Sequence, residues 1–210
     1  GTDSITISGN GVLADSDFTN VSNFETLVLG GTSGQANTLV LGAEYAASGL
    51  STITTKTGND TITLGSGVTT AQKITFEAGT DVIVATAATG AITVDVTTED
   101  DLTSADTITG GAGSSDVLKI TFEGATSALT ASDMGGVTNF ETISAATTAV
   151  GSLVLADANN VSSSITVDVT AITNTNTFTL DASAEDDGSI TFTGGGGIDT
   201  VTGTAKNDTI

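Results

Sequence analysis

The sequence predicts an all-β protein, folded as a parallel β-solenoid or β-roll of short stacked strands. Three observations favour this fold. Short segments alternate apolar with polar residues, turn residues separate these segments, and the chain carries an internal repeat of about 115 residues. The segments start about 9 to 14 residues apart, a spacing that is typical of β-sandwiches, barrels and solenoids.

Each expected strand is rich in Val, Ile and Thr, whose branched side chains favour extended backbone, and each ends at Gly, Asn, Asp or Ser. Two longer excursions, residues 13–25 and 129–141, could each hold a short helical turn. In chain order, the expected strands are residues 4–8, 26–31, 37–42, 52–56, 60–64, 73–77, 81–85, 92–96, 106–111, 118–123, 141–144, 152–156, 164–169, 177–181, 189–195 and 199–203.

The two excursions expose the internal repeat. When the halves are aligned, Asp3 meets Asp116, and the sequence NFET at 23–26 meets the same sequence at 139–142. We therefore divide the chain into a first repeat, residues 1–113, and a second, incomplete repeat, residues 114–210. Either one continuous solenoid or two tandem β-sandwich domains would give this duplication.

Composition favours the solenoid over the sandwiches. A β-sandwich usually has turn prolines and core Trp or Tyr, but this chain has no Pro, no Trp and one Tyr. We expect a thin core of Val, Ile, Leu and Thr, built without large aromatic side chains.

The composition also excludes several functions. The chain has no His and no Cys, which removes catalysis by these residues and zinc sites of the Cys/His type. The net charge is −21 and all four cationic residues are Lys, so nucleic acid and anionic membrane surfaces are poor partners. Membrane insertion is not expected, because no apolar run approaches the ~20 residues that span a bilayer.

One stretch carries a specific motif. Residues 194–202 match the nonapeptide GGxGxDxUx, where U is a large apolar residue, and include Gly195, Gly197 and Asp199. Residues 203–210 repeat the motif in degenerate form, with Asp208 nine residues after Asp199. The pattern resembles the RTX calcium-binding β-roll of secreted bacterial proteins.

The residue types in this motif suit calcium chemistry. Glycine allows tight turns, including left-handed ones, with backbone carbonyls pointing inward. Aspartate adds a hard anionic oxygen, and Ca²⁺ accepts 6 to 8 oxygens from carboxylates and carbonyls. The resemblance therefore implies Ca²⁺ as the cofactor, bound between neighbouring turns, with Gly195, Gly197, Asp199 and Asp208 as ligand positions.

Partial copies of the motif extend the set of candidate metal ligands to Asp3, Asp60, Asp81, Asp106 and Asp116. The glycines at 110–113 stand one residue too early relative to Asp116 for a regular site. The alternative is that each of these aspartates only caps the backbone of its own turn. The acidic residues at 100–101 and 185–187 are expected to be solvated loops rather than ligand clusters.

The wider sequence looks like bacterial surface-layer proteins and giant surface adhesins of the RTX type, on its Thr/Ala/Gly-rich composition, the two NFET elements and the glycine turns. This resemblance implies type I secretion, folding in calcium outside the cell, a location at the bacterial cell surface and self-association into a lattice or filament. Cell-surface polysaccharide is a second candidate partner. In the NFET elements we expect Phe24 and Phe140 to pack onto the solenoid, and Glu25 and Glu141 to face solvent or a calcium ion.

The function hypothesis is therefore a structural, calcium-stabilised, non-enzymatic segment of a surface-layer or extracellular matrix protein. The first alternative is an adhesin stalk or a module that binds carbohydrate or ice through ordered rows of Thr. A β-helix polysaccharide hydrolase that uses two carboxylates is disfavoured, because the chain lacks the aromatic platforms that sugar-cleaving sites normally have.

Overall fold

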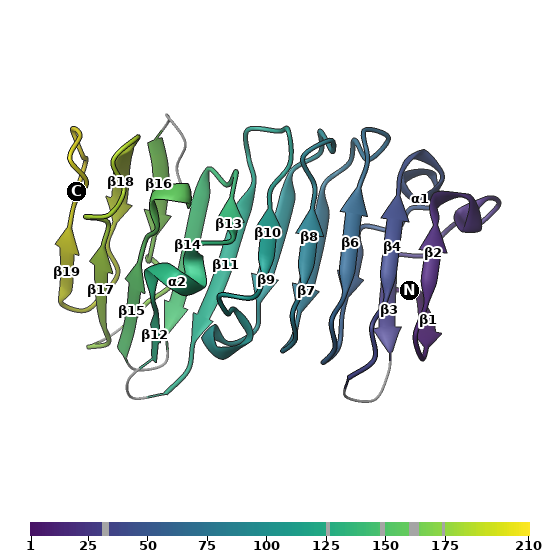
Figure 1. Cartoon of the computed structure of the whole chain (residues 1–210), viewed down its shortest axis with the longest axis horizontal. Coiled ribbons are helices and arrows are strands. Elements are labelled where there is room, and N and C mark those ends of the chain that lie inside the picture. Colours follow the sequence, from purple (N-terminus) through teal and green to yellow (C-terminus); the bar gives the residue numbers. More distant parts are fainter. Residues whose placement is uncertain (31–33, 125–126, 148–149, 160–163, 174) are drawn as a thin grey trace.

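The chain folds as a parallel β-solenoid, whose strands stack one after another along the long axis of the molecule (Figure 1). The computed structural model spans residues 1–210 and describes all of them except 31–33, 125–126, 148–149, 160–163 and 174. Every strand pairing within the described part of the chain is parallel, from β1 with β3 to β17 with β19. The predicted all-β solenoid is confirmed.

The strands form three sheets, which we call A, B and C. Sheet A has nine strands in the order β1 (Ser4–Ser8), β3 (Thr26–Gly30), β5 (Thr52–Thr54), β7 (Gln72–Phe76), β9 (Ile92–Val96), β11 (Val117–Phe122), β14 (Thr142–Thr147), β16 (Ser164–Asp168) and β18 (Ser189–Thr193). Sheet B has six, in the order β13 (Val137–Thr138), β10 (Thr107–Thr109), β8 (Val82–Val84), β6 (Thr61–Leu64), β4 (Thr38–Leu41) and β2 (Val12–Ala14). Sheet C has four, in the order β12 (Ser127–Leu129), β15 (Val150–Val154), β17 (Thr177–Asp181) and β19 (Asp199–Thr202).

Each coil of the solenoid adds one strand to sheet A and then crosses to the opposite layer. The first coils cross to sheet B and the last coils to sheet C, while the coil between β11 and β14 contributes to both. The expected boundary at residues 113–114 lies between β9 and β11, which pair directly in sheet A. The two repeats therefore share one continuous sheet.

Alternation along each strand builds the core. In sheet A, Leu27, Ile53, Ile74 and Val94 are register partners on four neighbouring strands, and each is fully buried. Such columns repeat from coil to coil, so every coil covers the apolar surface of the one before it. Each buried aliphatic side chain contributes roughly 1.5–3 kcal/mol to this stacking.

The expectation of a core of Val, Ile, Leu and Thr without large aromatics is wrong in two respects. Phe76, Phe122, Phe178 and Tyr45 are among the largest fully buried side chains, and the rings of Phe122 and Phe178 pack edge to face at 5.7 Å. Threonine is mostly outside, because strand threonines occupy the outward positions, where the hydroxyl stays in contact with water.

Helices are few and short, as the pattern predicted. The first excursion holds the 3-10 helix η1 (Asp15–Phe18), and the second holds α2 (Ala131–Met134). The others are α1 (Ala43–Ala47), η2 (Glu99–Asp101) and η3 (Asp157–Asn159). Within the described residues, no helix is long and apolar enough to cross a membrane.

The two NFET elements adopt the same backbone geometry. Asn23 and Asn139 both have a left-handed φ of 63°, which turns the chain into the next strand of sheet A. Phe140 is buried as expected, and Phe24 is half-buried against the core.

Candidate calcium-binding corners

The negative charge of the molecule is concentrated at the corners of the coils. Of the 25 acidic residues, those within strands are Asp95, Asp168, Asp181 and Asp199. The remainder lie in turns, loops and short helices between the strands. The corners are therefore the part of the fold that would gain most from a bound cation.

One corner, which we call the central aspartate column, stacks Asn37, Asp60, Asp81 and Asp106 just before the strands of sheet B. Oδ1 of Asp60 accepts the backbone N–H of Asn37, Oδ1 of Asp81 accepts that of Asp60, and Oδ1 of Asp106 accepts that of Asp81, at 2.8, 2.8 and 2.6 Å. The residues joined in this way are 23, 21 and 25 positions apart in the sequence. Each acid therefore links its own coil to the preceding one.

Because the carboxylates of this column are buried close together, having all of them ionised is unfavourable. Asp60, Asp81 and Asp106 are all at least 97% buried, and neighbouring strands lie about 4.8 Å apart. Two full charges at such a distance repel by roughly 3–4 kcal/mol at an effective dielectric of 20. Burial raises the pKa of Asp60 and, reinforced by the charges of Asp60 and Asp106, raises the pKa of Asp81 to about 7.

The middle acid of the column also has an unused oxygen. Oδ2 of Asp81 is buried and has no hydrogen-bond partner in the part of the chain that the structure describes. Such an oxygen needs either a proton or a cation to offset its lost hydration. Asp106, by contrast, uses Oδ2 to accept the backbone N–H and the hydroxyl of Thr103.

The opposite corner, before the strands of sheet A, contains two equivalent acid pairs. The backbone N–H of Asp3 donates to Oε2 of Glu25 at 2.7 Å, and that of Asp116 donates to Oε2 of Glu141 at 2.8 Å. Asp116 is fully buried, and its Oδ1 accepts the backbone N–H of Ile92 at 2.6 Å. Burial raises the pKa of Asp116, whose Oδ2 lacks a hydrogen-bond partner among the described residues.

The strict nonapeptide forms a different kind of turn. The backbone N–H of Gly195 donates to Oδ2 of Asp199, four residues later, at 3.0 Å. Oδ1 of Asp199 is buried and no described group hydrogen-bonds to it. The carboxylate is therefore held by its own turn, with one oxygen left for another ligand.

Backbone carbonyls crowd the glycines of this turn. A Cβ on Gly197 would lie 1.5 Å from the carbonyl oxygen of Asn176, and one on Gly195 would lie 2.6 Å from those of Val169 and Ile172. Glycine is required at both positions, because any side chain would collide with the preceding coil. The preceding coil thus packs its backbone carbonyls against the turn that holds Asp199.

Asp208 lies half a coil away from Asp199, at the sheet A corner. Its Oδ1 accepts the backbone N–H of Ile190 at 2.9 Å, across a separation of 18 residues, and Oδ2 accepts that of Thr204 at 2.8 Å. Two nonapeptides therefore make one coil here, whereas the coils of the central aspartate column are longer.

Calcium suits the donor set at residues 194–199 on chemical grounds. Ca²⁺ prefers carboxylate and carbonyl oxygens. This turn offers a buried carboxylate oxygen that has no partner among the described residues, and backbone carbonyls of the preceding coil pack against its glycines. Gly195, Gly197 and Asp199 would hold the ion, which would supply the positive charge that these oxygens lack. The chemistry of the groups in this turn therefore fits a calcium ion.

The nine predicted ligand positions thus fall into separate places. The structure brings Asp60, Asp81 and Asp106 together in one column, and Gly195, Gly197 and Asp199 together in one turn. Asp3, Asp116 and Asp208 lie at the sheet A corner of coils that are far apart along the solenoid. Calcium ligation by the individual residues stays a prediction.

Sequence reasoning missed several acceptors of backbone N–H groups. Glu25 and Glu141 cap the neighbouring coil instead of simply facing solvent, and Asn37 continues the aspartate column as a neutral member. Asp15 accepts the N–H groups of Gly42 and Tyr45 at the start of α1. Although burial opposes it, these and neighbouring backbone donors lower the pKa of Asp15.

The acidic loop at 185–187 takes part in one further group. Carboxylate oxygens of Asp157, Asp186 and Asp187 lie within 4.8 Å of one another, and all three residues are exposed. The backbone N–H of Asp186 donates to Oδ1 of Asp157 at 3.3 Å. Glu185 itself is fully buried, so the expectation of a solvated loop is wrong at this residue.

Comparison with known proteins gives one finding. A family model for the RTX calcium-binding nonapeptide repeat (4 copies) matches residues 45–68, 101–115 and 193–210. These segments contain Asp60, Asp106, Asp199 and Asp208, whereas Asp81 and Asp116 lie outside them. No curated protein and no solved structure matches the chain.

Repeats of this family are calcium-binding motifs, typically non-catalytic and found in secreted, extracellular proteins. The fold agrees with the match, because the RTX β-roll is also built from parallel stacked strands. The chain is thus similar to RTX calcium-binding repeats in three segments, and these segments support Ca²⁺ as its ion.

Proposed function

We propose that this chain is a calcium-stabilised structural segment of a secreted bacterial surface-layer or extracellular matrix protein, and that it self-associates into a lattice or filament. The observation that carries the proposal is the strict nonapeptide turn. There, Asp199 keeps a buried oxygen that has no partner among the described residues, and carbonyls of the preceding coil pack against the glycines. The work of such a segment is mechanical: calcium fixes the turns, and the fixed turns keep the coils stacked.

The charge of the molecule links self-association to cations. A net charge of −21 makes the copies repel one another, which restrains association until cations bind. Calcium would then favour both folding and assembly, so both would depend on the calcium concentration.

Calcium titration tests both parts of the proposal. Thermal unfolding is followed by circular dichroism in chelator and in millimolar calcium, with magnesium as the control ion. Molar mass is measured by light scattering, and assemblies are imaged by electron microscopy under the same conditions. A melting temperature that is the same in chelator and in calcium would refute the calcium role. A chain that stays monomeric at every calcium concentration would refute the assembly role.

A second function, the flat binding module, is favoured by the outer face of sheet B. Its outward register partners Val12, Thr38, Thr61, Val82 and Thr107 form a row of branched, uncharged side chains. Val12 is 82% exposed. Inhibition of ice recrystallisation, or binding on a glycan array, would support this function if the Thr61→Lys variant lost the activity. No signal in either assay would contradict it.

A further inference from the structure

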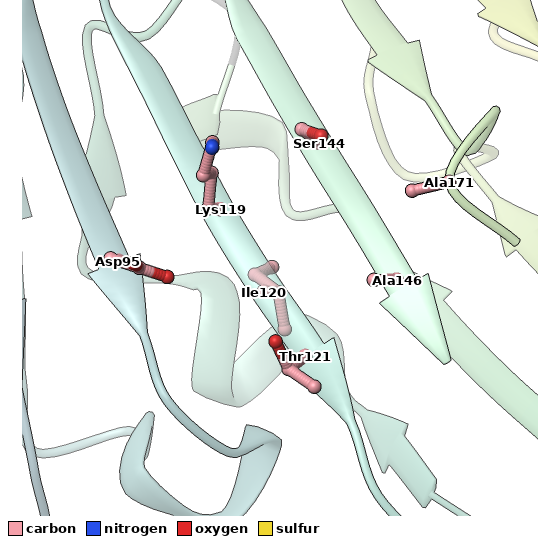
Figure 2. Close-up of a pocket in the computed structure, with 7 residues that line it drawn as sticks. All are labelled: Asp95, Lys119, Ile120, Thr121, Ser144, Ala146 and Ala171. Carbon is pink, nitrogen blue, oxygen red and sulfur yellow. The ribbon is translucent and has the colours of Figure 1, made fainter. Parts of the chain in front are cut away.

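The outer face of sheet A contains a hollow that is unrelated to the calcium corners. It has a volume of about 230 Å³ and lies over β9, β11 and β14, beside the turn after β16 (Figure 2). Figure 2 shows Asp95, Lys119 and Ser144 on three adjacent strands, with Ala171 on the neighbouring turn.

Side-chain size explains why the hollow is there. Ser144 and Ala146 are the outward residues of β14, and their register partners on β11 are Lys119 and Thr121. Two short side chains beside two longer ones leave a depression, which the turn at Ala171 closes on the other side. The floor is thus small and partly apolar, while one wall carries an ammonium group and a hydroxyl.

Lys119 is the cationic group that lines the hollow. The neighbouring carboxylate of Asp95 is paired with Lys73, whose Nζ lies 2.6 Å from Oδ2 of Asp95. Asp168, across Ser144 from Lys119, is engaged by Thr170, whose backbone N–H and hydroxyl donate to its Oδ1. The ion pairs of the described residues join Lys56 to Glu77 and Lys73 to Asp95, so the exposed ammonium of Lys119 is available to a ligand.

We propose that this hollow binds a monosaccharide unit that carries a carboxylate, as in an acidic polysaccharide. The ammonium of Lys119 would receive the carboxylate in a charge-assisted hydrogen bond. The hydroxyls of Thr121 and Ser144 would pair with sugar hydroxyls, and the methyl groups of Ala146 and Ala171 would contact the apolar face of the ring. The site goes beyond the structural function proposed above, because it gives the outer face of the solenoid a specific ligand.

The test is a titration of the ¹⁵N-labelled full chain in saturating calcium, so that the fold is the same in every sample. Galacturonic acid is the probe, galactose is the neutral comparator and acetate supplies the carboxylate alone. Galacturonic acid is expected to shift the amide signals of Lys119, Thr121 and Ser144, with an affinity about tenfold higher than that of galactose.

Three variants locate the site. Lys119→Gln is expected to weaken galacturonate binding about tenfold, and Ser144→Val, which fills the floor from an outward position, is expected to abolish it. Lys206→Gln removes an equally exposed lysine outside the hollow and is expected to bind as the parent does. Unchanged circular dichroism spectra establish that each variant has kept the fold.

The proposal is overturned if galacturonate produces no shifts, if Lys119→Gln binds as tightly as the parent, or if acetate binds as tightly as galacturonate. The last result would indicate a simple ion site. None of these outcomes affects the calcium proposal, since the calcium titration is read from thermal unfolding and not from this face.

Discussion

The central aspartate column and the C-terminal nonapeptide turn use the same local sequence, an aspartate two residues before an inward-facing apolar residue, in two different ways. In the column, Asp60 and Asp81 turn one oxygen to the backbone N–H of the preceding coil. In the nonapeptide, Asp199 turns one oxygen to the N–H of Gly195 in its own turn. The same acid links two coils in one place; in the other it is held inside its own turn, and one of its oxygens has no partner among the described residues.

The two regions also differ in their glycines. Residues 194–197 are four consecutive glycines, so their backbone can fold back onto Asp199 and lie against the carbonyls of the preceding coil. The turns before Asp60 and Asp81 have one glycine each within three residues, and there the carboxylate reaches across to the neighbouring coil. The column therefore links coils with one glycine in each turn, whereas Asp199 is held inside a turn that is made of glycine.

The largest effect is expected from adding a methyl group to the stacked glycines. A Cβ on Gly79 would lie 1.9 Å from the carbonyl oxygen of Gly58, and one on Gly197 would lie 1.5 Å from that of Asn176. Gly79→Ala should lower the free energy of unfolding by about 3 kcal/mol or more, because coils pack on both sides of it. Gly197→Ala should mainly release residues 194–210, which pack on one side.

Urea unfolding and amide hydrogen exchange distinguish these outcomes. Gly135→Ala is the control, because its Cβ would meet nothing closer than 3.3 Å and its backbone is right-handed helical. If Gly197→Ala destabilised the whole chain as much as Gly79→Ala, the two regions would not differ in the way described.

The next largest effect is expected from calcium removal, which should destabilise the nonapeptide turn more than the central aspartate column. At a hundredfold excess over Kd, one calcium ion bound to the folded state alone adds about 2.7 kcal/mol. Chelation is expected to speed amide exchange most at residues 194–210, and Asp199→Asn should abolish this calcium-dependent protection. Asp81→Asn is the matched variant and should leave it intact. Equal loss of calcium protection in both variants would make the column part of the same metal site.

The pH dependence of stability isolates the column itself. The pKa of Asp81 in the folded state, about 7, lies above its ordinary value of 3.8. The folded state therefore holds a proton that the unfolded state releases, so this contribution is complete below about pH 4 and is lost as pH rises to about 7. Without calcium, Asp81→Asn should be the more stable protein at pH 8, with the advantage shrinking towards pH 4.

Asn37 explains why the amide should be tolerated. It occupies the same column as Asp81, accepts the backbone N–H of Gly11 through Oδ1, and donates from Nδ2 to Oδ1 of Asp60. A parent protein whose urea midpoint did not fall, relative to Asp81→Asn, between pH 4 and pH 8 would contradict the raised pKa.

The sequence allowed the solenoid and the strict nonapeptide to be predicted, because both depend on local patterns. Alternation identified strands such as Thr61–Leu64, and the glycine run marked Asp199 directly. What the pattern could not reveal was the coil register, since hydrogen bonds between residues 21 to 25 positions apart depend on how long each coil is. That register decides that Asp60, Asp81 and Asp106 form one column.

The roles of Glu25 and Glu141 were hidden for a related reason. Their repetition in the two NFET elements indicated a shared role, but only the stacking of coils places each carboxylate on the N–H of Asp3 or Asp116. Aromatic packing was misjudged because composition counts residues without saying which of them face inward. Most of the seven phenylalanines do.

The smallest effect is expected at these two glutamates. It compares a cap beside a buried aspartate, Asp116, with a cap beside an exposed one, Asp3. Glu141→Ala would leave the N–H of Asp116 without its acceptor next to a fully buried side chain, which should cost about 1–2 kcal/mol. Glu25→Ala should cost only a few tenths, because the N–H of Asp3 lies at an exposed corner and water can replace the carboxylate. Glutamine at either position keeps an acceptor oxygen and should be nearly neutral. Chemical unfolding of the four variants checks this order, and equal losses for the two alanine variants would mean that burial does not set the value of these caps.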